Sequence, residues 1–280
     1  MCSTGKLFTL ALLLCLLFMA IDWVDAQVQR IYEEEYLFVG LRQIHVAFKW
    51  KNPVRLMDKS EFEKYLGSEE FAELTPTLNN TPYVYVSGSL REFHLSRKNM
   101  SIDGVYTLAL KTTPPLGLTY ILKERGKSRI DENAVFIKMY RMPVGFVPVD
   151  FNIAPMLIRL ADGVTPEGRI YPVLLCIWRF VGREGKLSFK LVRSFIYPSI
   201  SLEKSTIIEG ENVTVTVKIY NLKRGDIYGV HVEANLAGEK VGKVVDVVWG
   251  GILGKVGKKE VKLEVPGKTP GEHELTIKVW

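Results

Sequence analysis

Apolar and polar residues alternate along most of this chain with the period of two that is typical of β-strands. The clearest run is "NVTVTVKIYN" at residues 212–221, where aliphatic residues at the odd positions alternate with polar residues at the even positions. We expect the valines to face a core and the threonines to face solvent. Three similar runs follow, separated by glycine, proline and asparagine: "YGVHVEANL", "KEVKLEV" and "HELTIKVW". Together they predict an antiparallel β-sandwich.

The preceding region also favours strands. Short runs rich in aromatic and branched residues predict six of them: "LRQIHVAFKW", "YVYVSG", "EFHLS", "GVYTLALKTT", "LTYILKE" and "AVFIKMYRM". The run "IWRFVGREGKLSFKLV" predicts a β-hairpin that turns at Gly182 and Gly185. Residues 143–163 are apolar and interrupted by prolines, so we expect a long ordered loop with a short helix there.

One helical region stands out within these strands. Residues 58–74, "DKSEFEKYLGSEEFAEL", place Phe62, Leu66 and Phe71 on a rough apolar stripe, and Asp58 or Ser60 can cap the start. Gly67 interrupts the pattern, so the sequence leaves open one helix or two short ones.

Residues 27–40 combine three glutamates with aromatic residues. We expect a loose arm or a short helix there, and residues 27–38 are a candidate segment for donation to a partner sheet.

The predicted fold class is therefore mainly β, with a β-rich N-terminal domain that carries a helical insertion, followed by an immunoglobulin-like antiparallel sandwich. We place the domain boundary near Tyr197 and Pro198, because strict alternation of apolar and polar residues begins after them. The predicted organisation is a signal peptide at 1–26, a β-rich domain at 27–197 and the sandwich at 198–280.

The N-terminal residues are predicted to form a secretory signal peptide. Residues 7–21, "LFTLALLLCLLFMAI", are uninterrupted apolar residues preceded by Lys6. Such a run covers about 22 Å as a helix, less than the roughly 30 Å of a bilayer core. Val24 and Ala26 form a small-residue pattern, which predicts cleavage after Ala26. The alternative is an uncleaved signal anchor, extended by Trp23 and Val24.

Composition adds two points. The chain of 280 residues is 47% hydrophobic and 24% charged, as in ordinary globular proteins. Glutamine is rare while glutamate and lysine are plentiful, which fits a heat-adapted source. The net charge is +6, but the basic residues are spread along the chain without an aromatic-rich ladder, so we expect no nucleic-acid partner.

In an exported chain, three N-x-S/T motifs are candidate glycosylation sites. They begin at Asn79, Asn99 and Asn212. The last lies at the entry to the predicted strand, so a glycan on Asn212 would point to solvent.

No set of residues forms a catalytic or metal-binding motif. After cleavage only Cys176 remains, in an apolar run, and we interpret it as a small buried hydrophobe. The histidines lack metal-ligand spacing; we expect His45 and His231 to face solvent from strands, and His94 and His273 lie in short acidic contexts.

Other candidates are equally weak. Residues 250–259, "GGILGKVGKK", lack the spacing of a phosphate-binding loop. The acidic run at residues 33–35 is typical of a solvated face, and a calcium site would need separate carboxylates such as Asp103 and Asp162. We therefore predict no cofactor and no metal.

The C-terminal third resembles the CARDB-like and related immunoglobulin-like modules of archaeal and bacterial surface proteins. Residues 209–221, 229–242 and 265–279 carry this resemblance, "EGENVTVTVKIYN", "GVHVEANLAGEKVG" and "VPGKTPGEHELTIKV". It implies a spacer, adhesive unit or docking surface rather than a catalyst. Residues 245–257, "VDVVWGGILGKVG", depart from it by being more apolar and richer in glycine.

These observations favour a non-catalytic protein at the extracellular face of the cell envelope, acting by binding, adhesion or assembly. The expected partner is another envelope or extracellular protein, a surface glycan, or a further copy of the chain. One alternative is a glycan-active or glycan-binding protein, in which aromatic residues stack on sugars: Trp50, Tyr83, Tyr85 and Trp178. A second alternative is an extracellular receptor for a ligand.

Overall fold

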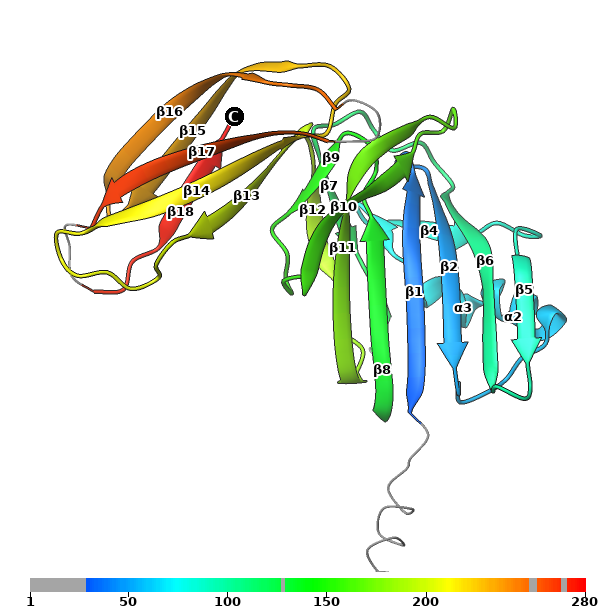
Figure 1. Ribbon diagram of the computed structural model, residues 1–280. Helices are drawn as coiled ribbons and strands as arrows, with labels where there is room; N and C mark the ends of the chain where they lie inside the picture. The colour runs from blue at the N-terminus through cyan, green and yellow to red at the C-terminus, as the bar shows by residue number, and fades with distance from the viewer. Residues whose placement is uncertain (1–28, 127–128, 252–255, 268–270) are drawn as a thin grey trace, which may run out of the picture.

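The computed structural model describes residues 29–126, 129–251, 256–267 and 271–280. The fold is mainly β, as predicted, with 59% strand and 6% helix. A large N-terminal sheet with short helices precedes a narrower C-terminal part built from two antiparallel sheets (Figure 1). The predicted signal peptide and Ala26 lie outside the described residues.

The N-terminal sheet has twelve strands in the order β10-β11-β8-β1-β2-β6-β4-β3-β7-β12-β9, with β5 paired to β6. Trp178 on β11 stacks on Phe189 of β12, with ring centroids 5.9 Å apart, so the two halves of the sheet face each other across one core. The strands are β1 Arg30–Val39, β2 Gln43–Lys51, β3 Thr77–Leu78, β4 Thr81–Tyr85, β5 Arg91–Ser96, β6 Ser101–Leu110, β7 Thr119–Lys123, β8 Ile130–Arg141, β9 Phe146–Val149, β10 Leu157–Val164, β11 Ile170–Arg183 and β12 Ser188–Arg193.

Strand β1 is central to this sheet. It pairs with β8 in parallel and with β2 in antiparallel orientation. The expected arm or helix is therefore wrong from residue 30 onward, and a strand already paired on both sides cannot be donated to a partner. The glutamate run was misleading because alternation buries Glu34 beside Tyr32 and Tyr36, while Glu33 and Glu35 lie half-buried on the other face.

The helical insertion forms two helices, α2 (Lys59–Leu66) and α3 (Glu69–Leu74), which confirms the second alternative. Asp58 closes a capping box with Glu61 at the start of α2, as its position predicts. The apolar stripe is also confirmed, since Phe62, Leu66 and Phe71 are buried.

Two sequence-based expectations fail in the second half of this domain. Residues 143–163 hold strands β9 and β10 instead of a helix. The expected hairpin between β11 and β12 does not form, because β11 pairs with β8 and β10 while β12 pairs with β7 and β9. The intervening residues cross from one half of the sheet to the other. Gly185 permits this crossing, because a Cβ there would lie only 2.3 Å from Cε1 of Phe180.

The C-terminal sheets pack as a sandwich around their own core. One sheet holds β13 (Ile196–Leu202), β14 (Asn212–Asn221) and β17 (Gly257–Pro266). The other holds β16 (Glu239–Val248), β15 (Ile227–Leu236) and β18 (Leu275–Val279). The inward residues expected on β14 are buried, and they are Val213, Val215, Val217 and Ile219. Strands β13 and β16 were not predicted; β13 contains Pro198, which an edge strand tolerates.

The two domains also contact each other. Leu222 is buried in the N-terminal core, and its N–H donates to the carbonyl of Phe195 at 2.8 Å. The Arg224 guanidinium lies 4.9 Å from the ring centroid of Tyr171 and donates to the carbonyl of Ile170 at 3.1 Å. Neither α2 nor α3, the helices in the part of the chain that is described, has the length or apolar character needed to cross a membrane.

Asn221 provides a test of the C-terminal packing. Its fully buried side chain donates to the carbonyls of Gly225, Val248 and Trp249 at 2.9, 3.0 and 3.2 Å and accepts from the N–H of Lys223 at 2.8 Å. Replacing it removes four hydrogen bonds and leaves the carbonyl of buried Val248 without this donor. We expect Asn221→Leu to lower the free energy of unfolding in urea by about 2–4 kcal/mol.

Asn235→Leu is the matched control, since the Asn235 Oδ1 accepts a single bond, from the N–H of Gly238 at 3.1 Å. We expect it to cost less than about 1 kcal/mol. Equal losses for the two variants would contradict the role assigned to Asn221.

Candidate functional site

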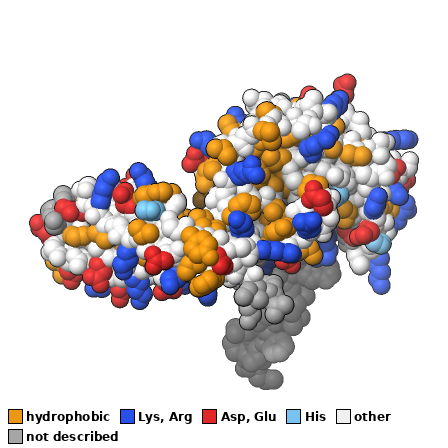
Figure 2. Space-filling model, turned by 90° about the horizontal axis from the view of Figure 1, so that it is seen from above, with side chains coloured by type: hydrophobic (Ala, Val, Ile, Leu, Met, Phe, Trp, Pro, Cys, Tyr) orange, Lys and Arg blue, Asp and Glu red, His pale blue; other side chains and the backbone are white. Residues whose placement is uncertain are grey.

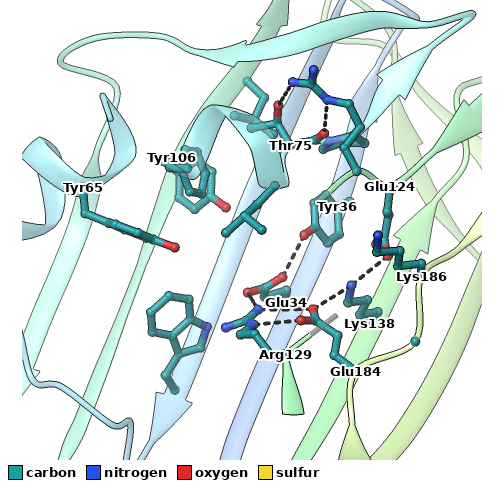
Figure 3. A pocket seen from close by; sticks show the side chains of 17 residues that line it. Glu34, Tyr36, Tyr65, Thr75, Tyr106, Glu124, Arg129, Lys138, Glu184 and Lys186 are labelled. Carbon is teal, nitrogen blue, oxygen red and sulfur yellow. Dashed lines mark hydrogen bonds and ion pairs between the residues drawn. The ribbon is translucent and has the colours of Figure 1, made fainter. Parts of the chain in front are cut away.

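The N-terminal domain contains a cavity of about 50 Å³ lined by both charged and aromatic side chains. Strands β1, β2, β6 and β8 and helices α2 and α3 contribute to its lining. Further side chains come from residues 124–125, 129 and 184–186, which follow or precede strands. Figure 3 shows these groups directed into one space from elements far apart in the sequence.

Strand register explains the first half of the site. Alternation along β1 turns Glu34 and Tyr36 to the inner face. The parallel pairing with β8 then sets Lys138 beside Glu34 and Tyr140 beside Tyr36. The two tyrosine rings stack with centroids 4.4 Å apart, and the Tyr36 hydroxyl donates to Glu34 Oε2 at 2.7 Å.

Five charged side chains form a continuous network. The Arg129 guanidinium donates to both Glu184 oxygens, at 2.8 and 3.2 Å, and to Glu34 Oε1 at 3.2 Å. The Lys138 ammonium lies 2.7 Å from Glu184 Oε1 and 2.8 Å from Glu124 Oε2. Apart from Arg129, whose side chain is 34% exposed, each of these side chains is at most 10% exposed.

Each carboxylate in this network has at least two donors. Glu124 also accepts from the Tyr140 hydroxyl at 2.6 Å and from the N–H of Leu187 at 3.0 Å. Buried charges remain ionised when they are paired and hydrogen-bonded in this way. The Arg129 guanidinium lies 4.9 Å from the ring centroid of Tyr32 and 5.7 Å from that of Trp50, which adds a cation–π contribution.

Electrostatics argue against a general-acid role for Glu184. Burial alone would raise the pKa of Glu184, but the charges of Lys138 and Arg129 and their hydrogen bonds outweigh it and lower the pKa to about 2. A general acid needs a carboxyl group that keeps its proton near neutral pH. Glu184 is ionised there, so it fits a structural ion pair.

Three polar groups of the cavity have no protein partner among the described residues. The Trp50 indole N–H is buried without an acceptor. The hydroxyls of Tyr65 and Tyr106 form no hydrogen bond with another described residue, and Figure 3 shows both pointing toward the centre of the cavity. Buried polar groups are nearly always paired in native proteins, so the unpaired indole N–H of Trp50 indicates a place for a ligand or ordered water. The two tyrosine hydroxyls are not among the buried atoms without a partner, which are Trp50 Nε1 and Tyr85 Oη in the described residues.

The opposite side of the cavity is fixed by Arg125. Its guanidinium donates to the carbonyls of Ala72 and Thr75, at the C-terminal end of α3. These contacts satisfy free carbonyls at the helix end and hold the helix against the segment that follows β7.

The predicted glycosylation residues are all exposed in the structure: Asn79, Asn99 and Asn212. Asn212 begins β14 with its side chain in solvent, as expected. Its glycosylation, like that of the other two, remains a prediction. The Asn79 Oδ1 already accepts from the N–H of Ile121 at 2.7 Å.

Cys176 is fully buried, and burial raises the pKa of its thiol to about 12, which fits its interpretation as a small hydrophobe. His231 is exposed as expected, stacked on Trp280 with centroids 5.3 Å apart. The expectation for His45 is wrong in part. It is half-buried with Nδ1 3.1 Å from the Thr107 hydroxyl, and burial lowers its pKa. His94 lies 3.3 Å from Asp103.

The candidate sugar-stacking residues separate clearly. Tyr83 and Trp178 are fully buried in the core, so neither can stack on a ligand, whereas Trp50 lines the cavity. The candidate calcium ligands Asp103 and Asp162 lie on β6 and β10, with strands β1 and β2 between them by the shortest path through the sheet. Within the described ranges, no group of three or more His, Cys, Asp or Glu residues could hold a metal ion.

The C-terminal sandwich carries a second, exposed aromatic surface. Tyr228, Trp249 and Trp280 are 58–70% exposed. Figure 2 shows acidic and basic side chains interspersed along the visible face of this narrow domain, with hydrophobic side chains between them. This surface lacks the enclosed donors of the cavity.

Comparison with known proteins identifies no family for the chain. A scan against protein-family models gives no match to the chain, and a search of curated proteins gives none either. The resemblance of the C-terminal sandwich to CARDB-like modules therefore stays a prediction.

Glu184 makes the stability of the domain depend on acid. Its pKa is about 2 when folded, below the ordinary 4.5, so its contribution is complete above about pH 5 and is lost as pH falls toward 2. The loss is on the order of 3 kcal/mol. We expect Glu184→Gln to flatten the fall in unfolding free energy between pH 5 and 2. The exposed Glu203→Gln is the control, and a Glu184→Gln slope equal to it would contradict this assignment.

Unpartnered hydroxyls should be dispensable for stability. We expect Tyr106→Phe to change the free energy of unfolding by less than about 0.5 kcal/mol, because no protein bond is lost. Tyr140→Phe removes the donor to Glu124 and should cost about 1–3 kcal/mol. Urea denaturation of both variants tests this, and a Tyr106→Phe loss as large as that of Tyr140→Phe would show that its hydroxyl has a protein partner.

Proposed function

We propose that this is an exported protein of the cell envelope that acts by binding, and that the cavity of its N-terminal domain is the binding site. The observation that carries the proposal is that the polar groups of the cavity fall into two sets, paired charged groups and unpaired uncharged donors. Five charged side chains are engaged with one another, while the donors of Trp50, Tyr65 and Tyr106 have no hydrogen-bond partner among the described residues.

Export and location follow from the signal-like N-terminus, and the N-x-S/T motifs agree with them. The C-terminal sandwich acts in this proposal as a spacer or docking module, as its resemblance implies. The partner is an envelope component, either a protein or a surface glycan.

The alternative of a glycan-cleaving enzyme is less well supported. Such enzymes need one carboxylic acid that holds its proton and a second carboxylate beside it. Here the low pKa of Glu184 and the pairing of Glu34 and Glu124 oppose the acid role. Binding without turnover needs neither.

Co-sedimentation of the mature chain with envelopes of its source cells tests the proposal. We expect saturable binding that falls at least fivefold in the double variant Tyr65→Phe/Tyr106→Phe, because two free donors are removed. The matched control is Tyr228→Ser/Trp249→Ser on the sandwich surface, which should bind within twofold of the unmodified chain. Absence of saturable binding, or loss only in the control, would contradict the proposal.

A further inference from the structure

We infer that the ligand of the cavity is a neutral sugar, which inserts one ring substituent and rests its ring on the half-buried aromatic side chain of Tyr65. This inference depends on the proposed binding function and specifies the class of its ligand.

The free groups of the cavity select for acceptors. Trp50 is 8% exposed, and its indole N–H can only donate. Burial raises the pKa of Tyr65 to about 12 and that of Tyr106 well above its ordinary value, so both hydroxyls keep their protons at neutral pH. A ligand rich in hydroxyl or carbonyl oxygens would satisfy all three donors.

The charges of the site nearly cancel. Three carboxylates, Glu34, Glu124 and Glu184, and four cations, Arg125, Arg129, Lys138 and Lys186, line the cavity and leave one net positive charge. An anionic ligand would meet the three carboxylates, and the cations other than the exposed Lys186 are already engaged by carboxylates or carbonyls. A cationic ligand would meet the part-exposed Arg129 guanidinium and the three donors. An uncharged ligand avoids both costs.

Size and shape point to part of a sugar. One water molecule needs about 10–15 Å³ of cavity volume, so the cavity of about 50 Å³ has room for a few water molecules or a small substituent but not for a whole ring. A hydroxymethyl or acetamido substituent fits. Phe71 lies between Tyr65 and Tyr106, with ring centroids 5.4 and 5.8 Å away. Phe71 and Tyr106 are buried, so the half-buried ring of Tyr65 is the aromatic face among these three that a sugar can reach. The C–H groups of a sugar ring pack on such faces while its hydroxyls remain hydrogen-bonded.

Calorimetric titration of the full mature chain with defined disaccharides tests the inference. The neutral probes are cellobiose, mannobiose and N,N′-diacetylchitobiose; digalacturonate is the anionic probe and the chitosan dimer is the cationic one. We expect a neutral probe to bind most tightly and to displace the chain from its envelopes. Tyr65→Phe and Tyr106→Phe should each weaken that binding roughly 3- to 10-fold without lowering the melting temperature.

Tyr83→Phe gives the opposite control. Its hydroxyl donates to the carbonyl of Leu41 at 2.6 Å away from the cavity, so it should lower the melting temperature and leave the affinity within twofold. The inference is overturned if a charged probe binds best, or if cavity-dependent envelope binding resists every neutral saccharide; the proposed binding function would survive both results. Absence of envelope binding together with tight, cavity-dependent sugar binding would instead overturn the envelope role alone.

Discussion

The N-terminal domain is organised around a requirement that five buried charges satisfy one another. Glu34, Glu124, Glu184, Arg129 and Lys138 come from strands β1 and β8 and from the segments beside β7, β8 and β11. Removing any one of them would leave a partner charged and buried, which costs several kcal/mol. The network therefore fixes where the chain crosses between the two halves of the sheet. It also fixes the rim of the cavity, because the same crossing segments line it.

This arrangement separates stability from recognition. The charged groups that hold the domain together are paired with one another. The groups that face the cavity are uncharged donors on aromatic rings. Leaving them without a protein partner costs little free energy in the unbound state, and they form hydrogen bonds when a ligand binds. A site of this kind is suited to selective binding of an uncharged, oxygen-rich partner. The C-terminal sandwich, packed against the N-terminal domain through Leu222 and Arg224, gives the site a stiff connection rather than a loose tether.

Sequence alone predicted local structure better than long-range structure. Three features could be predicted because each depends on residues close in the chain: the period-two run of β14, the helix cap at Asp58 and the mainly β class. The pairing of β11 and β12 was not, since Gly182 and Gly185 look the same in a crossing as in a hairpin. The site was missed for a similar reason. Glu34 sits in a run that resembles a solvated face, and Arg129 sits in a basic stretch that resembles a turn. The parallel register of β1 and β8 sets Lys138 beside Glu34, and the pairing of Ile130 with Arg183 at the end of β11 brings Arg129 to Glu184.

The indole N–H of Trp50 offers the most direct measurement of the central claim, that a free donor waits in the cavity for an acceptor oxygen. Trp178 is an internal reference, because its N–H already donates to the carbonyl of Ile153 at 2.9 Å. In nitrogen–proton correlation spectra of the labelled chain, the account predicts that a saturating neutral disaccharide moves the Trp50 indole proton downfield and leaves that of Trp178 in place. A Trp50 signal that stays unchanged while the sugar is bound would contradict it.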